Sequence, residues 1–184
     1  MLKTLCTKIL FGWLGFTETV TEPLPPKCII ALAPHTSNWD FIIGNLYSGT
    51  KNYRSDFLMK KEWFFWPLGI LFRKMGGIPV YRSKKTSMTD TLAERIKEME
   101  RFELAVTPEG TRSKVTTWKR GFYFIALKAG IPIQLYDLDY KNKVIRCTKE
   151  LMPTGDVDAD MREIMEYYEN SNAKYPEKFA IENI

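Results

Sequence analysis

The side chains best suited to acid–base chemistry stand together in the segment PHTSNWD, residues 34–40. It contains His35, the one histidine of the 184-residue chain, and Asp40 lies five positions later. A carboxylate bonded to imidazole Nδ1 fixes the ring and leaves Nε2 free to take a proton from a substrate hydroxyl. The pair therefore predicts a general base. A second interpretation is structural, because Ser37 and Asp40 have the spacing of a helix capping box, which needs no catalysis.

A second polar segment, TPEGTRS at residues 107–113, directly follows the apolar stretch ELAV. Gly110 permits a tight turn, while Thr111, Arg112 and Ser113 supply hydrogen-bond donors. Such a loop can present backbone N–H groups, a hydroxyl and a guanidinium to a phosphate. Taken alone, the segment also fits an ordinary polar turn.

Arg82 ends a third segment, GGIPVYR, and by itself fits a solvated arginine before the turn SKK. The three segments each follow a separate expected strand, so an α/β sheet would bring them to one edge. One base, one carboxylate and two arginines suit hydroxyl activation beside an anionic group. No dinucleotide-binding, Walker or nucleophile-elbow pattern competes with them. Cys28 begins a buried apolar stretch, which argues against a nucleophilic role.

The elements that must position these residues alternate along the chain between strands and helices. Strands are expected at residues 28–33, 56–60, 77–82, 103–107, 131–140 and 143–151, and helices at 39–48, 62–75, 87–101, 120–130 and 158–170. This alternation is typical of a single α/β domain with helices on both faces of a sheet. The aromatic stretch EWFFWPLGILF within 62–75 is expected to pack in the core, with an apolar surface for a lipid chain as the alternative.

Residues 1–20 are expected to form an N-terminal amphipathic helix ahead of a domain at 21–184, with the proline-rich TEPLPPK as the break. At 100° per residue, one face carries Leu2, Leu5, Cys6, Ile9, Trp13 and Phe16. The apolar run is too short to span a bilayer, and no signal-peptide cleavage site follows it. Two interpretations stay open: a helix that lies at a membrane surface, and a helix that packs on its own domain.

Charge and cysteine content narrow the class of partner. The chain has 27 Lys plus Arg and 22 Asp plus Glu, a net charge of +5. This excess suits a phosphate-bearing substrate, an acidic carrier protein or a membrane surface. Nucleic acid is disfavoured, since no nucleic-acid motif is present. The three cysteines are widely spaced and form neither a disulfide framework nor a zinc pattern, which favours a reducing compartment.

Four motifs, taken in order, resemble those of one enzyme family. They are the H-x4-D pair His35 and Asp40, the segment GGIPVYR with Arg82, the block PEGTRS at 108–113, and AGIPIQ at 129–134. As an ordered set they resemble the glycerolipid acyltransferase superfamily, that of the 1-acylglycerol-3-phosphate acyltransferases. The resemblance implies a mixed, mostly parallel sheet flanked by helices.

The resemblance also implies a reaction: transfer of a fatty acyl group from acyl-CoA or an acyl-carrier-protein thioester to a hydroxyl of a lysophosphatidate-like acceptor. His35 would be the general base and Asp40 its orienting partner. The positions that match acceptor-binding motifs are Arg82, Glu109, Gly110, Thr111 and Arg112. No metal and no cofactor beyond the thioester co-substrate are implied.

A peripheral location at the cytoplasmic face of the membrane is expected. The alternatives are a non-catalytic lipid- or membrane-binding protein with the same fold, and an acyltransferase with a non-glycerophosphate lipid acceptor.

Overall fold

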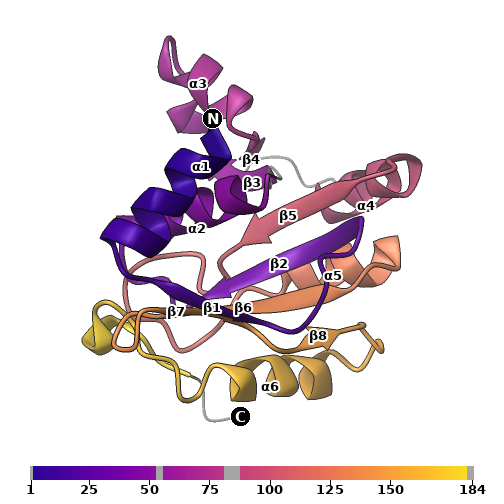
Figure 1. Cartoon of the computed structure of the whole chain (residues 1–184). Helices are drawn as coiled ribbons and strands as arrows, with labels where there is room; N and C mark the ends of the chain where they lie inside the picture. Colours follow the sequence, from indigo (N-terminus) through magenta and orange to yellow (C-terminus); the bar gives the residue numbers. More distant parts are fainter. Residues whose placement is uncertain (1, 53–55, 81–87, 182–184) are drawn as a thin grey trace.

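A mixed β-sheet forms the centre of the molecule in the computed structural model, which describes residues 2–52, 56–80 and 88–181 (Figure 1). Within these residues the sheet has eight strands, in the order β1-β7-β6-β2-β5-β3-β4, with β8 paired to β6. The strands are β1 (Thr17–Val20), β2 (Lys27–Ala33), β3 (Asp56–Lys60), β4 (Gly77–Val80), β5 (Phe102–Val106), β6 (Ile133–Asp139), β7 (Val144–Cys147) and β8 (Glu150–Leu151).

The helices are α1 (Leu2–Thr7), α2 (Asn38–Lys51), α3 (Leu68–Lys74), α4 (Met88–Glu98), α5 (Gly121–Ala129) and α6 (Val157–Tyr167). A π-helical turn, η1 (Lys8–Trp13), continues α1, and two 3₁₀ turns are η2 (Lys61–Trp63) and η3 (Pro176–Lys178). No described helix has the length and apolar character needed to cross a membrane.

Strand direction places the loops that carry chemistry at one edge of the sheet. Strand β2 is parallel to both β5 and β6, and β3 is parallel to β5 and β4. The carboxyl ends of these strands therefore lie at the same edge. The antiparallel pairs are β6 with β7 and β6 with β8, so the sheet is mixed and mostly parallel, as expected from the sequence.

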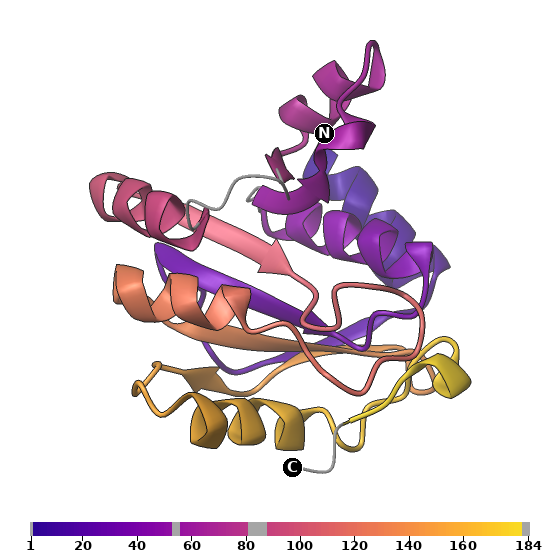
Figure 2. The same cartoon turned by 180° about the vertical axis from the view of Figure 1, so that it is seen from behind.

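The alternation of side chains along β2 explains the three layers. Ile29, Ala31 and Ala33 point into a core shared with α4, α5 and α6, whereas Cys28 and Ile30 point into a second core shared with η1, α2 and β7. Successive side chains of a strand face opposite sides of a sheet, so a strand buried on both faces is apolar throughout. Figures 1 and 2 show α1 and α2 on one side of the sheet and α5 and α6 on the other.

The expected helix over 62–75 is wrong in extent and in burial. The segment is instead the short turn η2 followed, after Pro67, by the seven-residue α3. Proline lacks an N–H group and disfavours helical backbone in the residue before it, which breaks the helix at this point. Trp63, Phe65 and Trp66 are exposed rather than core residues, and α3 projects away from the sheet (Figure 1).

The expected helix over residues 1–20 is also shorter than predicted. Helical structure ends at Trp13, and residues 17–20 form β1, which pairs with β7. The π-helical turn changes the 3.6-residue period, so Leu10 turns into the core while Trp13 is 83% exposed. Cys6 packs against α2, where a Cβ on Gly49 would lie 2.6 Å from the Cys6 sulfur. One side of this helix thus packs on the domain, while Leu2 and Leu5 stay exposed.

Candidate active site

His35 and Asp40 are in direct contact where β2 gives way to α2. The Nδ1 atom of His35 lies 3.0 Å from Oδ2 of Asp40. The carboxylate is fully buried, whereas the His35 side chain keeps 18% of its surface exposed. An Nδ1–H that donates to this carboxylate leaves Nε2 as the acceptor of a substrate proton.

The helix cap and the His–Asp pair are the same structure. Ser37 caps α2 by accepting the backbone N–H of Trp39, and Asp40 completes the capping box. Oδ2 of Asp40 accepts the backbone N–H groups of Thr36 and Ser37 at 2.9 and 2.8 Å and also contacts the imidazole. The two interpretations of this segment are therefore compatible, because the cap holds the carboxylate against the histidine.

Tyr140, at the end of β6, completes the surroundings of Asp40. Its hydroxyl donates to Oδ1 of Asp40, the oxygen that faces away from the backbone donors. Burial, together with the hydrogen bond to Asp40, raises the pKa of Tyr140 well above its usual value, so the phenol remains a donor. Both oxygens of the carboxylate are thus held.

Glu109, in the loop that follows the neighbouring strand β5, contacts the histidine backbone. Its Oε1 accepts the backbone N–H of His35 at 2.7 Å, and the side chain is almost fully buried. Burial raises the pKa of Glu109 to about 7, although the hydrogen bond from His35 opposes that rise. Its second oxygen, Oε2, has no hydrogen-bond partner among the described residues. The hydrogen-bonded oxygen of this carboxyl thus contacts the backbone of the His35 loop.

The rest of the 107–113 loop turns back toward α2. Gly110 has a φ of +65° and donates its N–H to the Thr107 carbonyl, a conformation that favours glycine. The hydroxyl of Thr111 accepts the Ser113 N–H, and the exposed Arg112 guanidinium donates to the Asn38 side chain at the start of α2. Arg112 therefore lies beside the loop that carries His35. Arg82 falls outside the described residues.

The C-terminal segment contributes residues that no sequence motif indicated. The Tyr175 N–H donates to the hydroxyl of Thr36, and Lys174 Nζ lies 5.3 Å from the ring centroids of both Trp39 and Tyr140. The loop that holds His35 is therefore covered by a segment more than a hundred residues away. No local sequence pattern predicts this contact, because the fold of the whole sheet brings the two segments together.

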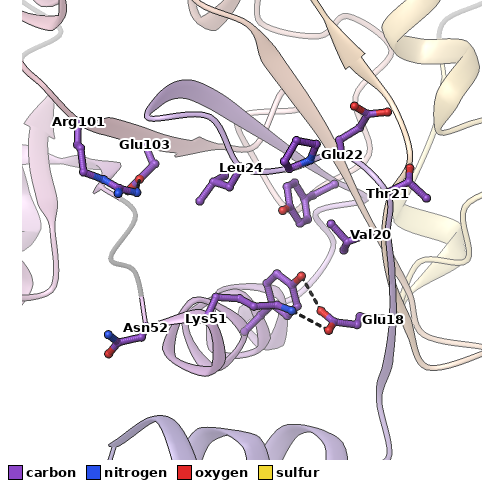
Figure 3. Close-up of a pocket in the computed structure, with 12 residues that line it drawn as sticks. Glu18, Val20, Thr21, Glu22, Leu24, Lys51, Asn52, Arg101 and Glu103 are labelled. Carbon is purple, nitrogen blue, oxygen red and sulfur yellow. Dashed lines mark hydrogen bonds and ion pairs between the residues drawn. The ribbon is translucent and has the colours of Figure 1, made fainter.

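One pocket of about 1050 Å³ lies away from this site (Figure 3). Its lining includes the β1–β2 connection, the end of α2 and the start of β5, and it contains none of the predicted site residues. Its charges are largely paired: Lys51 bonds Glu18 at 2.6 Å and Arg101 bonds Glu103 at 2.8 Å. Since β5 begins here and Glu109 follows its other end, this pocket and His35 occupy opposite edges of the sheet.

Other candidates for chemistry are weak in the described part of the chain. No group of three His, Cys, Asp or Glu side chains is placed to hold a metal ion there. Burial raises the pKa of the Cys28 thiol to about 12, with Glu103 adding to the effect. A thiol with so high a pKa is a poor nucleophile, which agrees with the sequence interpretation.

Comparison with known proteins gives a consistent result. The profile of the family described as Acyltransferase matches residues 16–134. The fold is similar to the crystal structure of the 1-acyl-sn-glycerophosphate (LPA) acyltransferase PlsC from Thermotoga maritima, at 19% identity and a TM-score of 0.59. That match covers 94% of this chain and 80% of the other, and at this identity it shows the fold alone. No curated protein gave a significant match.

Proposed function

The chain belongs to the Acyltransferase family, and from this premise we propose that it moves a fatty acyl group from a thioester to a lipid hydroxyl, with His35 as the general base. The observation that carries the proposal is the 3.0 Å contact between a partly exposed His35 and a fully buried Asp40. A base must be reachable by substrate while its partner is fixed, and this arrangement meets both requirements.

The proposed reaction is a direct transfer. As the acceptor oxygen attacks the thioester carbonyl carbon, Nε2 of His35 takes the hydroxyl proton, and Asp40 stabilises the positive charge on the ring. The C–S bond then breaks, and the leaving thiolate takes the proton from Nε2. The products are an ester and a free thiol, and no group remains bonded to the protein.

The acceptor we propose is a lysophosphatidate-like lipid. Support comes from the basic loop beside the histidine, where Arg112 reaches the start of α2. A guanidinium is well suited to a phosphate, because it donates two parallel hydrogen bonds. We assign phosphate binding to Arg112, Thr111 and Gly110, and to Arg82 from its place in the motif set. We assign Glu109 the role of positioning His35, because its carboxyl accepts the His35 backbone N–H.

A donor of either kind, acyl-CoA or acyl-carrier-protein thioester, fits this chemistry equally, since the same C–S bond is broken. The net charge of +5 suits both, as coenzyme A carries phosphates and carrier proteins are acidic.

Mass analysis of the products tests the proposal. The purified protein is incubated with a long-chain acyl thioester and, in separate samples, a lysophosphatidate, a neutral monoacylglycerol or no acceptor. We expect thiol release and a diacylglycerol phosphate product only with the lysophosphatidate. A product with monoacylglycerol alone would favour a non-glycerophosphate acceptor, and lipid binding without any thiol release would favour a non-catalytic lipid-binding protein.

A further inference from the structure

An unusual concentration of exposed apolar side chains covers residues 61–74, the segment made by η2, the turn at Pro67 and α3, called here the α3 projection. Trp66 is 81% exposed, and the others are about half exposed: Trp63, Phe65, Ile70 and Leu71. Soluble proteins rarely display so many large apolar side chains together without a partner for them.

These side chains are not required to hold the projection together. Its interior is made by Phe64 and Phe72, whose rings meet edge to face with centroids 6.3 Å apart. Gly69 packs so closely on the Phe64 backbone that a Cβ there would lie 2.6 Å from the Phe64 carbonyl oxygen. The guanidinium of Arg73 lies over the Phe64 ring. The projection is therefore held together by these contacts, and its other large apolar side chains face outward.

The position of the projection relates it to the candidate active site. It begins at the carboxyl end of β3, and β3 is parallel to β5, which is parallel to β2. The projection and His35 thus leave the same edge of the sheet. Figures 1 and 2 show α3 standing out from the rest of the molecule at the end where α1 also begins.

The charges beside this surface indicate what it meets. The projection carries three basic residues, Lys61, Arg73 and Lys74, against one acidic residue, Glu62. The helical segment at residues 2–13 has Lys3 and Lys8, both exposed, and no acidic residue. Aromatic and aliphatic side chains flanked by basic ones match a bilayer interface, where the rings enter the headgroup region and cations meet anionic lipid.

We propose that the α3 projection is a docking surface for an anionic phospholipid bilayer and that it brings the catalytic edge of the sheet to the membrane. This inference builds on the proposed function, because a lipid acceptor would then reach His35 from the bilayer it resides in.

Vesicle sedimentation without any thioester tests the inference independently of catalysis. The test protein carries Trp66→Ser and Ile70→Ser, and the matched control carries Met152→Ser. Met152 is another exposed apolar residue, at 57%, and it directly follows β8. Figure 1 shows β8 far from α3. Serine adds no charge, so only apolar contact changes. Circular dichroism and size-exclusion chromatography check the fold and oligomeric state of each variant.

We expect wild type and Met152→Ser to bind vesicles of phosphatidylcholine with one-third phosphatidylglycerol, and to bind less well as salt rises. The double variant should bind at least about tenfold more weakly. Equal binding by all three proteins would overturn the inference, as would a wild type that stays in solution. A double variant that instead lost a wild-type dimer would also overturn it and assign the surface to a second copy of the chain.

The two proposals fail separately. A protein that binds vesicles through this surface but releases no thiol supports the docking inference alone. A protein that acylates a detergent-dispersed acceptor but ignores vesicles overturns the docking inference and leaves the proposed reaction standing.

Discussion

Two segments leave the same edge of the sheet and use their residues in opposite ways. After β2, the loop at residues 34–40 buries its polar groups: Asp40 is fully enclosed and accepts hydrogen bonds from backbone and side-chain donors. After β3, the α3 projection exposes its apolar groups, and its interior is a single pair of rings.

The comparison suggests that the two segments have different roles: the 34–40 loop is held rigid, and the α3 projection offers a surface for contact. A buried, fully bonded carboxylate holds an imidazole in one orientation, which acid–base chemistry requires. An exposed aromatic face gains free energy only when something covers it, which suits attachment to a partner. Substitutions in the 34–40 loop should therefore change the acyl-transfer rate or the free energy of unfolding. Substitutions in the α3 projection should instead change membrane binding.

Loss of Asp40 has the largest expected effect. Asp40→Ala removes the partner of the imidazole and leaves the backbone N–H groups of Thr36 and Ser37 unpaired. We expect the acyl-transfer rate to fall by about a thousandfold or more and the free energy of unfolding to fall by about 2–4 kcal/mol. Enzyme assays and urea titrations measure the two quantities.

Asp40→Asn is the matched control, because it keeps an acceptor oxygen and removes the charge. Its rate should fall by about a hundredfold with a smaller loss of stability. A wild-type rate in Asp40→Asn would contradict a role for the carboxylate in supporting a charged imidazole. Vesicle binding should be unchanged in both variants.

The ionisation of Glu109 should make stability depend on pH. Its pKa is about 7 in the folded protein against 4.5 for an unperturbed carboxyl, so the folded state binds the proton more tightly. The stabilisation is present below pH 4.5 and is lost as pH rises to about 7, by about 3 kcal/mol in total. Urea titrations across this range should show the fall in wild type.

Glu109→Gln removes that ionisable group and should lessen the dependence. Buried Asp137, whose pKa burial raises to about 6, remains in both proteins, so the difference between them isolates Glu109. Parallel pH profiles for the two proteins would show that Glu109 does not titrate in this way.

Tyr140→Phe should have a moderate effect on rate. The ring contact with Phe16 is retained, but Oδ1 of Asp40 loses its hydrogen bond from the hydroxyl. We expect kcat to fall by about tenfold with KM nearly unchanged, since Tyr140 acts through Asp40 and not on substrate. Tyr47→Phe removes a hydroxyl bonded to Glu18, away from His35, and should leave kcat unchanged. Equal rates in the two variants would refute the positioning role.

Removal of the helix cap should have the smallest effect. Ser37→Ala deletes the hydroxyl that accepts the Trp39 N–H, and we expect about 1 kcal/mol lower stability. Asp156→Ala removes a similar cap from α6, far from the site, and should cost a similar amount. Only Ser37→Ala should also reduce the acyl-transfer rate, by a few fold, if the cap helps to place Asp40. Thermal melts and rate assays compare them.

The sequence predicted the strands that are buried on both faces and the helices whose apolar residues recur with the helical period. Strand β2 is apolar from Cys28 to Ala33 because both its faces are covered, and α5 is capped by Gly130, as its sequence indicated. Strand β1 was missed because its residues Thr17–Thr19 are exposed and give no apolar signal. The prediction of one helix over 62–75 was wrong at Pro67. Proline interrupts helical backbone there, although the apolar pattern continues past it.

The candidate site divides in the same manner. His35 and Asp40 are five residues apart, so their contact follows from a single strand–turn–helix and could be anticipated. Glu109 was assigned from its motif, but its bond to the His35 backbone depends on β2 and β5 lying side by side. Tyr140 and Lys174 meet the site only through β6 and the C-terminal segment, and no local spacing encodes such contacts.

The acyl-transfer rate of His35→Ala, measured on vesicles that contain the acceptor, tests the central claim most directly. Vesicle binding is measured in the same samples. We predict a fall in rate of about a thousandfold or more, with vesicle binding equal to that of wild type. A His35→Ala protein that binds the vesicles and transfers acyl groups at the wild-type rate would contradict it.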